Sequence, residues 1–274
     1  MRGRLIDFAS PKIMGILNVT PDSFYDGSQY NDSTTAMKQV EKMIREGADM
    51  IDVGGYSSRP GAGDISPDEE AGRVAGIIAA IAKEFPNIPV SIDTFRSEVA
   101  TRALDAGAGI INDITGGDHD KELRKLAIKH RAPYIIMHMR GTPKTMNTLA
   151  QYDDVVKEVL TALEKKVHEF GADGINDVAI DAGFGFAKNV DQNFQMLRNL
   201  DAFAMIGKPL LVGISRKSMV WRTLEIKPGE ALNGTTALNM VALMKGADIL
   251  RVHDVKEARE CVKLYGNISR KDTK

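Results

Sequence analysis

The sequence predicts an α/β fold, a (β/α)8 or TIM barrel, formed as a single domain over residues 1–274. Two observations lead to this fold class. Short β-rich runs alternate with amphipathic helical stretches along the whole chain, and nearly every run has an apolar body with a polar tip. Eight parallel strands joined by helical crossovers make a barrel of about this length. A doubly wound open sheet is the alternative, although no Gly-x-Gly-x-x-Gly turn follows the first run.

Turn residues bound each predicted element. The eight strands are Ile13–Asn18, Met50–Gly54, Val90–Asp93, Gly109–Asp113, Tyr134–His138, Val178–Asp181, Leu210–Ile214 and Asp248–Val252. The helical stretches between them include Thr34–Glu46, Pro67–Phe85, Arg96–Ala106, Asp153–Phe170 and Asn233–Lys245. A short recurring phrase before the strands predicts that four helices end at left-handed glycines, namely Gly47, Gly107, Gly171 and Gly246.

Composition narrows the function classes. A formal net charge of −1 and a pI near 6.5 argue against nucleic-acid or membrane binding as the main task. The charged amino terminus shows no export signal, and the longest apolar stretch is about half a membrane span, so a cytoplasmic protein is expected. The single cysteine, Cys261, is predicted to be a buried filler in a reducing compartment.

In a barrel of this kind, catalytic groups lie at the carboxyl ends of the strands and in the loops that follow them. The polar tips there are Asn18, Asp52, Asp93, Asn112, His138, Asp181, Ser215, Lys217, Arg251 and His253. Any one of them could simply cap a helix or turn a loop. Together they predict a functional rim, on which His138 is expected to be a satisfied core or rim residue.

Asp93, Asn112 and Asp181 form an acidic and amide group that suits a flat, nitrogen-rich heterocycle, because a carboxylate accepts two parallel N–H bonds. An octahedral Mg²⁺ cage is the alternative. A cationic group, made of Arg59, Arg216, Lys217, Arg251 and His253, predicts an anionic, phosphorylated substrate. A solvated basic rim is the other reading of these cations.

The connections after the first two strands are long and rich in Gly, Pro, Asp and Ser, which predicts lids over the substrate rather than plain disorder. Phe184 and Phe186 are interpreted either as core aromatics or as walls of an aromatic site. A serine triad and a zinc centre are disfavoured, because the chain has no Gly-x-Ser-x-Gly elbow and no His-x-x-x-His pair.

From about Ile13 to Glu257, the chain resembles the dihydropteroate synthase family of bacterial-type, pterin-binding TIM barrels. The resemblance lies in eight ordered segments, at residues 15–24, 52–61, 91–94, 111–113, 137–146, 181–186, 213–218 and 251–254. It implies a transferase of folate biosynthesis, which condenses 6-hydroxymethyl-7,8-dihydropterin pyrophosphate with 4-aminobenzoate. It also implies Mg²⁺, a homodimer and competition by sulfonamides.

The resemblance assigns roles to individual residues. For the pterin these are Asp93, Asn112, Met137, Asp181, Phe186, Lys217 and Arg251, of which Asp93, Lys217 and Arg251 are expected to be catalytic. For the pyrophosphate they are Asn18, Ser58, Arg59, Arg251 and His253, with Asn18 also facing Mg²⁺. For 4-aminobenzoate they are Ser58, Arg59, Pro60, Phe186, Ser215 and Lys217.

The chain departs from the family pattern at four places. Tyr56 and Ser58 stand for Glu and Thr in the second loop, which leaves its contacts and its response to sulfonamides open. Ala182 and Ala187 stand for Pro and Gly. Two other functions are weighed: a methyltetrahydrofolate–corrinoid methyltransferase, which would lack the pyrophosphate machinery, and a non-catalytic pterin-binding paralogue, which would lose Asp93, Lys217 or Arg251.

Overall fold

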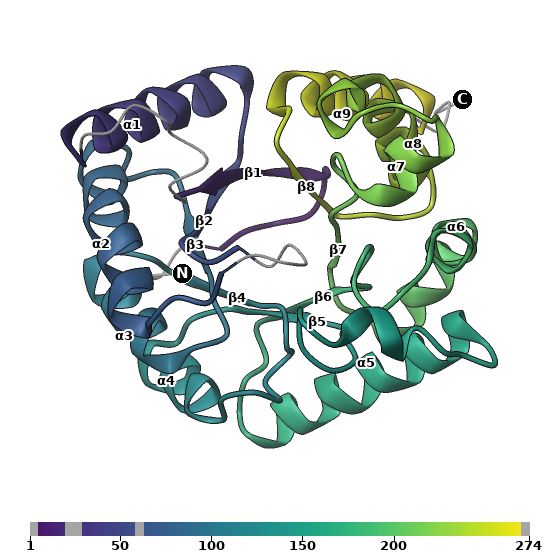
Figure 1. Ribbon diagram of the computed structural model, residues 1–274, viewed down its shortest axis with the longest axis horizontal. Helices are drawn as coiled ribbons and strands as arrows, with labels where there is room; N and C mark the ends of the chain where they lie inside the picture. Colours follow the sequence, from purple (N-terminus) through teal and green to yellow (C-terminus); the bar gives the residue numbers. More distant parts are fainter. Residues whose placement is uncertain (1–4, 20–28, 58–62, 270–274) are drawn as a thin grey trace.

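Eight parallel strands close into one barrel in chain order, with β1 beside β8, in a computed structural model that describes residues 5–19, 29–57 and 63–269 (Figure 1). The strands are β1 (Lys12–Asn18), β2 (Met50–Gly54), β3 (Val90–Asp93), β4 (Ile110–Asp113), β5 (Tyr134–Met137), β6 (Val178–Asp181), β7 (Leu210–Val212) and β8 (Ile249–Val252). Closure confirms the predicted barrel and excludes the open sheet. The strand ends agree with the predicted ones within two residues.

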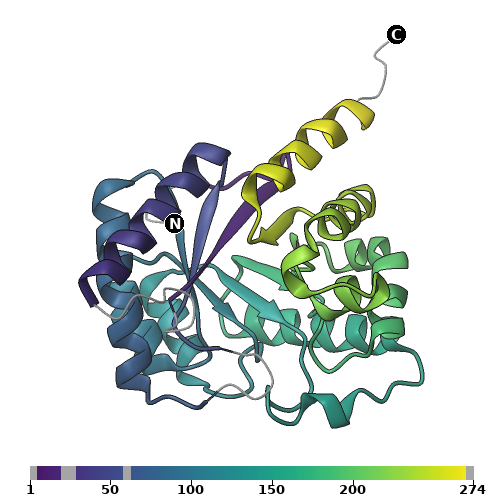
Figure 2. The same cartoon turned by 45° about the horizontal axis from the view of Figure 1, so that its top comes forward.

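Helices cover the outside of the barrel (Figures 1 and 2). They are α1 (Gln29–Glu46), α2 (Pro67–Glu84), α3 (Ser97–Ala106), α4 (Glu122–His130), α5 (Val155–Ala172), α6 (Val190–Arg198), α7 (Ser218–Thr223), α8 (Leu232–Met244) and α9 (Val255–Ile268). Short 3-10 turns lie at Met146–Leu149, Leu200–Ile206 and Pro228–Glu230. Over the described residues, no helix is both long and apolar enough to cross a membrane.

Three of the four predicted glycine stops are confirmed, and one is wrong. Gly47, Gly107 and Gly246 have φ of 103°, 125° and 92°. Helix α5, however, runs through Gly171 to Ala172, and Gly174 takes the positive φ of 87°. The backbone N–H of Asp173 still bonds to the carbonyl of Glu169, so the helix continues past the glycine and closes three residues after it.

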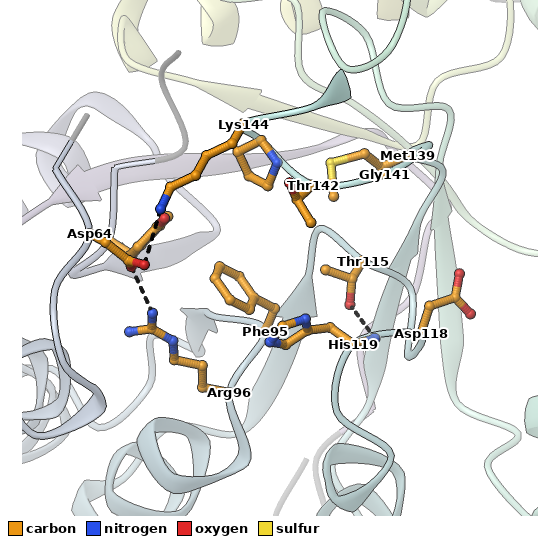
Figure 3. A pocket seen from close by; sticks show the side chains of 12 residues that line it. Asp64, Phe95, Arg96, Thr115, Asp118, His119, Met139, Gly141, Thr142 and Lys144 are labelled. Atoms are coloured by element: carbon orange, nitrogen blue, oxygen red, sulfur yellow. Dashed lines mark hydrogen bonds and ion pairs between the residues drawn. The ribbon is translucent and has the colours of Figure 1, made fainter. Parts of the chain in front are cut away.

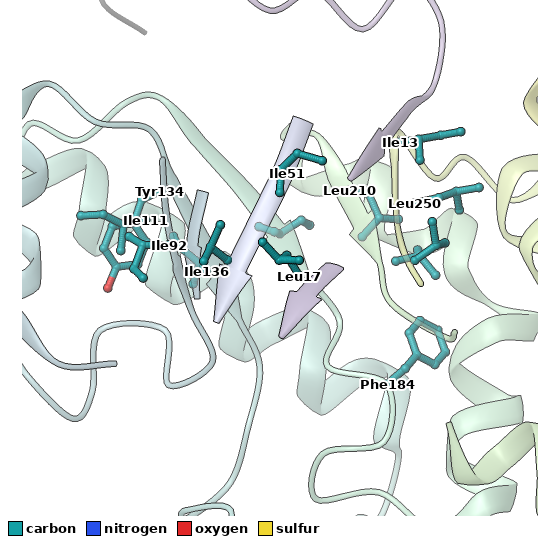
Figure 4. Packing of buried hydrophobic residues seen from close by; sticks show 14 of the residues in the cluster. Ile13, Leu17, Ile51, Ile92, Ile111, Tyr134, Ile136, Phe184, Leu210 and Leu250 are labelled. Carbon is teal, nitrogen blue, oxygen red and sulfur yellow. The ribbon is translucent and has the colours of Figure 1, made fainter. Parts of the chain in front are cut away.

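The core has an outer layer between strands and helices and an inner layer inside the barrel. Figure 4 shows part of the outer layer, including Ile51, Ile111 and Leu250. The inner layer consists of Met14, Met50, Ile110, Ile135, Ala179, Leu211 and Ile249, with Ile6 and Phe8 packed against it. Successive side chains on a strand point to opposite faces, so every strand except β3 contributes to both layers.

The same alternation places the polar side chains. Two residues after Met50, Ile110, Ala179 and Ile249, towards the carboxyl end of each strand, come Asp52, Asn112, Asp181 and Arg251. These positions share the inward face with the apolar residues that precede them. The polar group therefore rests on a packed apolar floor, at the end of the barrel where catalytic residues lie.

Candidate active site

Arg251, on β8, links two carboxylates at the mouth of the barrel. Its Nε donates to Oδ2 of Asp52 at 2.6 Å, and one of its terminal nitrogens donates to Oδ2 of Asp93 at 2.5 Å. The Nδ2 of Asn112 also donates to Oδ2 of Asp52, at 3.0 Å. Arg251 thus links Asp52 to Asp93, and Asn112 gives Asp52 a second donor, so the predicted residues belong to one ion-pair and hydrogen-bond network.

This network shifts the pKa values of its members. Burial raises the pKa of Asp93 to about 7, against the opposing effect of Arg251. Burial alone would lower the pKa of Arg251, but Asp52 and Asp93 outweigh it and raise that pKa. The guanidinium is therefore always charged.

Asp181 and Lys217 form a second charged group, next to Arg251: a Cβ on Gly213 would lie 3.8 Å from Cβ of Arg251 and 3.9 Å from Nζ of Lys217. Burial raises the pKa of Asp181, and Lys217 opposes that rise. Burial likewise lowers the pKa of Lys217 to about 8. Lys217 Nζ donates to the carbonyl of Phe184 and lies 4.7 Å from the centre of the Phe186 ring.

The two phenylalanines have different environments. Phe184 is buried in the outer core. Phe186 is only partly buried and packs against the cluster of Phe95, Ile114 and Met137. The core interpretation thus holds for Phe184, whereas Phe186, beside Met137 and the ammonium of Lys217, is placed to wall a site.

The loops after β7 and β8 are joined by side chains. Ser215 Oγ lies 3.0 Å from Nδ1 of His253 and accepts a hydrogen bond from the His253 backbone N–H at 3.2 Å. Arg216 makes a bidentate ion pair with Asp254, at 2.9 and 2.7 Å. Arg216 is therefore committed to a structural pair, and of the cations predicted after β7, Lys217 is the one beside Asp181.

Asn18 ends β1, partly exposed, and faces the same mouth. Gly54 explains how: a Cβ on this glycine would lie 3.8 Å from Oδ1 of Asn18 and 3.7 Å from Oδ2 of Asp93. The amide and the carboxylate thus converge over a residue without a side chain. Of the predicted site residues, Ser58, Arg59 and Pro60 lie outside the described part of the chain, as does most of the first long connection.

A cavity of about 450 Å³ lies beside this site, among the loops that follow β2, β3, β4 and β5. Figure 3 shows Lys144 and Arg96 reaching Asp64 from two sides, at 3.2 and 3.1 Å. Phe95 and Tyr56 contact edge to face at a ring distance of 5.2 Å. Tyr56, the departure in the second loop, therefore packs on the loop after β3.

Sequence reasoning assigned no role to Asp52 and missed Lys188. Lys188 is buried, and its Nζ lies 3.1 Å from Nδ1 of His138. Burial lowers the pKa of His138 to about 2, and the positive charge of Lys188 is the next largest cause of this shift. His138 is thus the hydrogen-bonded histidine that was expected. The one feature of the sequence that pointed to Asp52 was its position at the carboxyl end of a strand. Among residues 5–19, 29–57 and 63–269, no group of three or more His, Cys, Asp or Glu side chains could hold a metal ion.

Known proteins resemble this chain over its full length. Residues 14–253 match the family of pterin binding enzymes. The dihydropteroate synthase of Escherichia coli K12 is 42% identical over all of this chain and 97% of its own, and that of Synechocystis is 44% identical over 92% and 88%.

Solved structures agree with this match. The Yersinia pestis dihydropteroate synthase in a sulfonamide drug complex has a TM-score of 0.91 at 40% identity, over 97% of both chains. The Xanthomonas albilineans enzyme with 4-aminobenzoic acid has a TM-score of 0.92 at 34% identity, over 98% of this chain and 97% of that one. The same enzyme with 7,8-dihydropteroate has a TM-score of 0.88 at 32% identity, over 98% of both chains. Sequence, fold and the charged mouth of the barrel agree: the chain belongs to the dihydropteroate synthase family of pterin-binding transferases.

Proposed function

We propose that the mouth of this barrel condenses 6-hydroxymethyl-7,8-dihydropterin pyrophosphate with 4-aminobenzoate, giving 7,8-dihydropteroate and pyrophosphate. The observation that carries the proposal is the placement of a buried carboxylate, Asp181, and a partly exposed lysine, Lys217, next to the Arg251–Asp93 pair. A pterin needs both hydrogen-bond acceptors and a cation next to an aromatic wall. Similar enzymes hold 4-aminobenzoic acid or 7,8-dihydropteroate.

The pterin ring would be held by Asp93, Asn112, Met137, Asp181, Phe186, Lys217 and Arg251. A carboxylate can accept the amino and ring N–H groups of the pterin as a parallel pair. At Asp181 the backbone N–H of Gly183 takes one lone pair of Oδ1, at 2.8 Å, and the second lone pair of Oδ1 together with Oδ2 can accept such a pair. Met137 and Phe186 supply apolar surface for the ring faces.

The pyrophosphate would lie against Asn18, Ser58, Arg59, Arg251 and His253. Mg²⁺ is usually bound through few protein oxygens together with substrate phosphates and water. The amide oxygen of Asn18, over the space left by Gly54, fits that kind of site. A bound Mg²⁺ would supply charge neutralisation for the departing pyrophosphate.

The 4-aminobenzoate side would be formed by Ser58, Arg59, Pro60, Phe186, Ser215 and Lys217. Sulfonamides would compete there. With Tyr56 packed on Phe95, the start of the second loop is held by an aromatic contact in place of the glutamate of the family pattern.

The reaction we propose is a dissociative substitution at the pterin methylene. The carbon–oxygen bond to pyrophosphate breaks first, and the amine of 4-aminobenzoate then attacks the cation and loses a proton. Arg251 stabilises the negative charge of the leaving group, while Asp93 and Lys217 hold the ring along which the positive charge spreads. Lys217, with a pKa of about 8, would be charged at neutral pH. No covalent enzyme intermediate is needed.

One assay tests this function. The pure protein is incubated with the dihydropterin pyrophosphate, Mg²⁺ and 4-aminobenzoate, and the release of pyrophosphate is followed. We expect release that depends on 4-aminobenzoate and yields 7,8-dihydropteroate. Absence of release, or release indifferent to 4-aminobenzoate, would contradict it. Methyl transfer from methyltetrahydrofolate to a corrinoid would favour the methyltransferase, and pterin binding without turnover the non-catalytic paralogue.

Two further properties belong to the proposal. Helices α8 and α9 pack on each other and carry exposed apolar side chains, which support a homodimer. These side chains are Val241, Met244, Leu264 and Ile268. Light scattering of the purified protein tests it. A cytoplasmic location is supported by the single buried thiol, Cys261, which suits a reducing compartment.

A further inference from the structure

Lys188 is a buried lysine that the reaction above does not use. Its side chain lies beneath the turn between β6 and α6, and the residue exposes only 8% of its surface. Its Nζ donates to the carbonyl of Gly183 at 3.0 Å and to that of Phe186 at 3.1 Å. Because an ammonium has three N–H donors, the third is directed at Nδ1 of His138, 3.1 Å away.

Burial lowers the pKa of Lys188 to about 7, and while its ammonium is charged the histidine accepts this bond, so the ring is then neutral and carries its proton on Nε2. The low pKa of His138 agrees with that form. Lys188 thus ties the end of β5, where His138 lies, to two carbonyls of the turn after β6. All three N–H groups of the ammonium therefore have acceptors, two in the turn and one at the end of β5.

That turn carries much of the proposed pterin pocket. The backbone N–H of Phe186 bonds to the carbonyl of Gly183 at 3.1 Å, so these two residues bracket one tight turn. The N–H of Gly183 donates to Asp181, and the carbonyl of Phe184 accepts from Lys217. The turn therefore accepts hydrogen bonds from Lys217 on the pocket side and from Lys188 on the opposite side.

We propose that Lys188 is a positioning residue for the pterin pocket: its buried ammonium holds the Gly183–Phe186 turn against β5 and so orients Asp181 and Phe186. This rests on the proposed function of the pocket. The ammonium also places a third positive charge near the Asp181 carboxylate, where, after Lys217 and Arg251, it opposes the rise in pKa that burial causes. Because its Nζ contacts a histidine and two backbone carbonyls, Lys188 would act through the turn rather than on a substrate.

The test uses Lys188→Met in the full chain, with 6-hydroxymethylpterin as the binding probe. Loss of a positioning group of this kind weakens ligand binding by about 10- to 100-fold. We expect the Kd for 6-hydroxymethylpterin to rise by that factor, with the KM for the pterin pyrophosphate rising more than the KM for 4-aminobenzoate. A Kd within about twofold of the wild type in the folded variant would overturn the proposal.

The matched control is Lys166→Met. Lys166, on α5, also donates to two backbone carbonyls, those of Thr115 and Gly116, at 3.3 and 2.9 Å, and it is mostly buried. It fixes a different turn, after β4. We expect this variant to lose thermal stability but to keep its affinity for the pterin probe; an equal loss of affinity in both variants would show a general packing effect and refute the proposal.

Histidine NMR on the wild-type protein keeps the proposal testable should Lys188→Met fail to fold. We expect His138 to stay neutral across mildly acidic to mildly basic pH, with its proton on Nε2 while Lys188 is charged, and its Nδ1 signal to shift when 6-hydroxymethylpterin binds. Titration of His138 near its ordinary pKa, or no response to the pterin, would refute it. If the protein binds the pterin probe as described but shows no turnover, the proposed function fails while this inference stands.

Discussion

The Nε of Arg251 lies 2.6 Å from Oδ2 of Asp52, although 199 residues separate them in the chain. Asp52 is fully buried, and Arg251 exposes 19% of its side chain. We expect Asp52→Ala to lower the free energy of unfolding by about 3 kcal/mol, because it leaves a buried charge with one partner fewer. Urea unfolding checks this.

Asp52→Asn is the control, because it keeps an oxygen acceptor. It should cost about half as much, since charge-assisted bonds are about twice as strong as neutral ones. Equal stability of all three proteins would contradict the role of the pair.

Lys217 should lower the free energy of unfolding, because its charge is buried, while it is needed to bind the pterin. Burial lowers its pKa in the folded protein to about 8, below the ordinary lysine value of 10.5, so the unfolded chain binds more protons between these values and stability rises with pH there. Below pH 8 the buried charge costs its full amount. Lys217→Met should therefore raise the free energy of unfolding by about 1–3 kcal/mol at pH 7, by less at pH 10, and abolish pterin binding. Denaturant melts at both pH values check the sign; a gain that grows with pH would show that it is wrong.

Gly183 should tolerate no side chain. Its φ is 70°, and a Cβ would lie 2.0 Å from the carbonyl oxygen of His138. Gly183→Ala should cost about 3–5 kcal/mol, from left-handed strain and from the clash with backbone. Gly174→Ala is the matched control, because its φ is 87° with nothing within 4 Å of a Cβ, and it should cost only about 1–2 kcal/mol. Similar melting temperatures for the two variants would show that the clash is relieved at little cost.

Asp181 and Ser58 should separate the two substrates. Asp181→Ala should abolish pterin binding and turnover, because it removes the carboxylate that accepts the pterin N–H groups. Ser58→Ala should mainly raise the KM for 4-aminobenzoate. Steady-state kinetics with each substrate varied in turn check both. Near wild-type kinetics in Asp181→Ala would overturn the assignment of the ring pocket.

The barrel and most of its rim could be predicted because both depend on local patterns. Asn112, Asp181 and Arg251 come two residues after an inward apolar residue, so the period of a strand places them on the inner face. Partners could not be predicted in the same way. Arg251 meets Asp52 only because closure brings β8 beside β1 and β1 beside β2.

The misplaced glycine and the missed lysine have related causes. Gly171 carries the same Gly-Ala-Asp phrase as Gly47, yet the helix continues because the next backbone bonds still form. From the sequence Lys188 is expected to be an ordinary solvated lysine, because the residues next to it in the chain do not indicate that its side chain contacts two carbonyls and a histidine. In both cases the decisive groups are backbone atoms, which a sequence pattern does not reveal.

The ion pairs inside the mouth of the barrel also set its electrical balance. When ionised, the carboxylates of Asp52, Asp93 and Asp181 match in number the cations of Lys188, Lys217 and Arg251. These six groups together present little net field to a ligand at a distance, and their charges act over the short range of direct contact. They should therefore distinguish ligands after entry rather than attract them, so the salt dependence of the association of a pterin ester should come mainly from Arg59, the further cation proposed for the pyrophosphate.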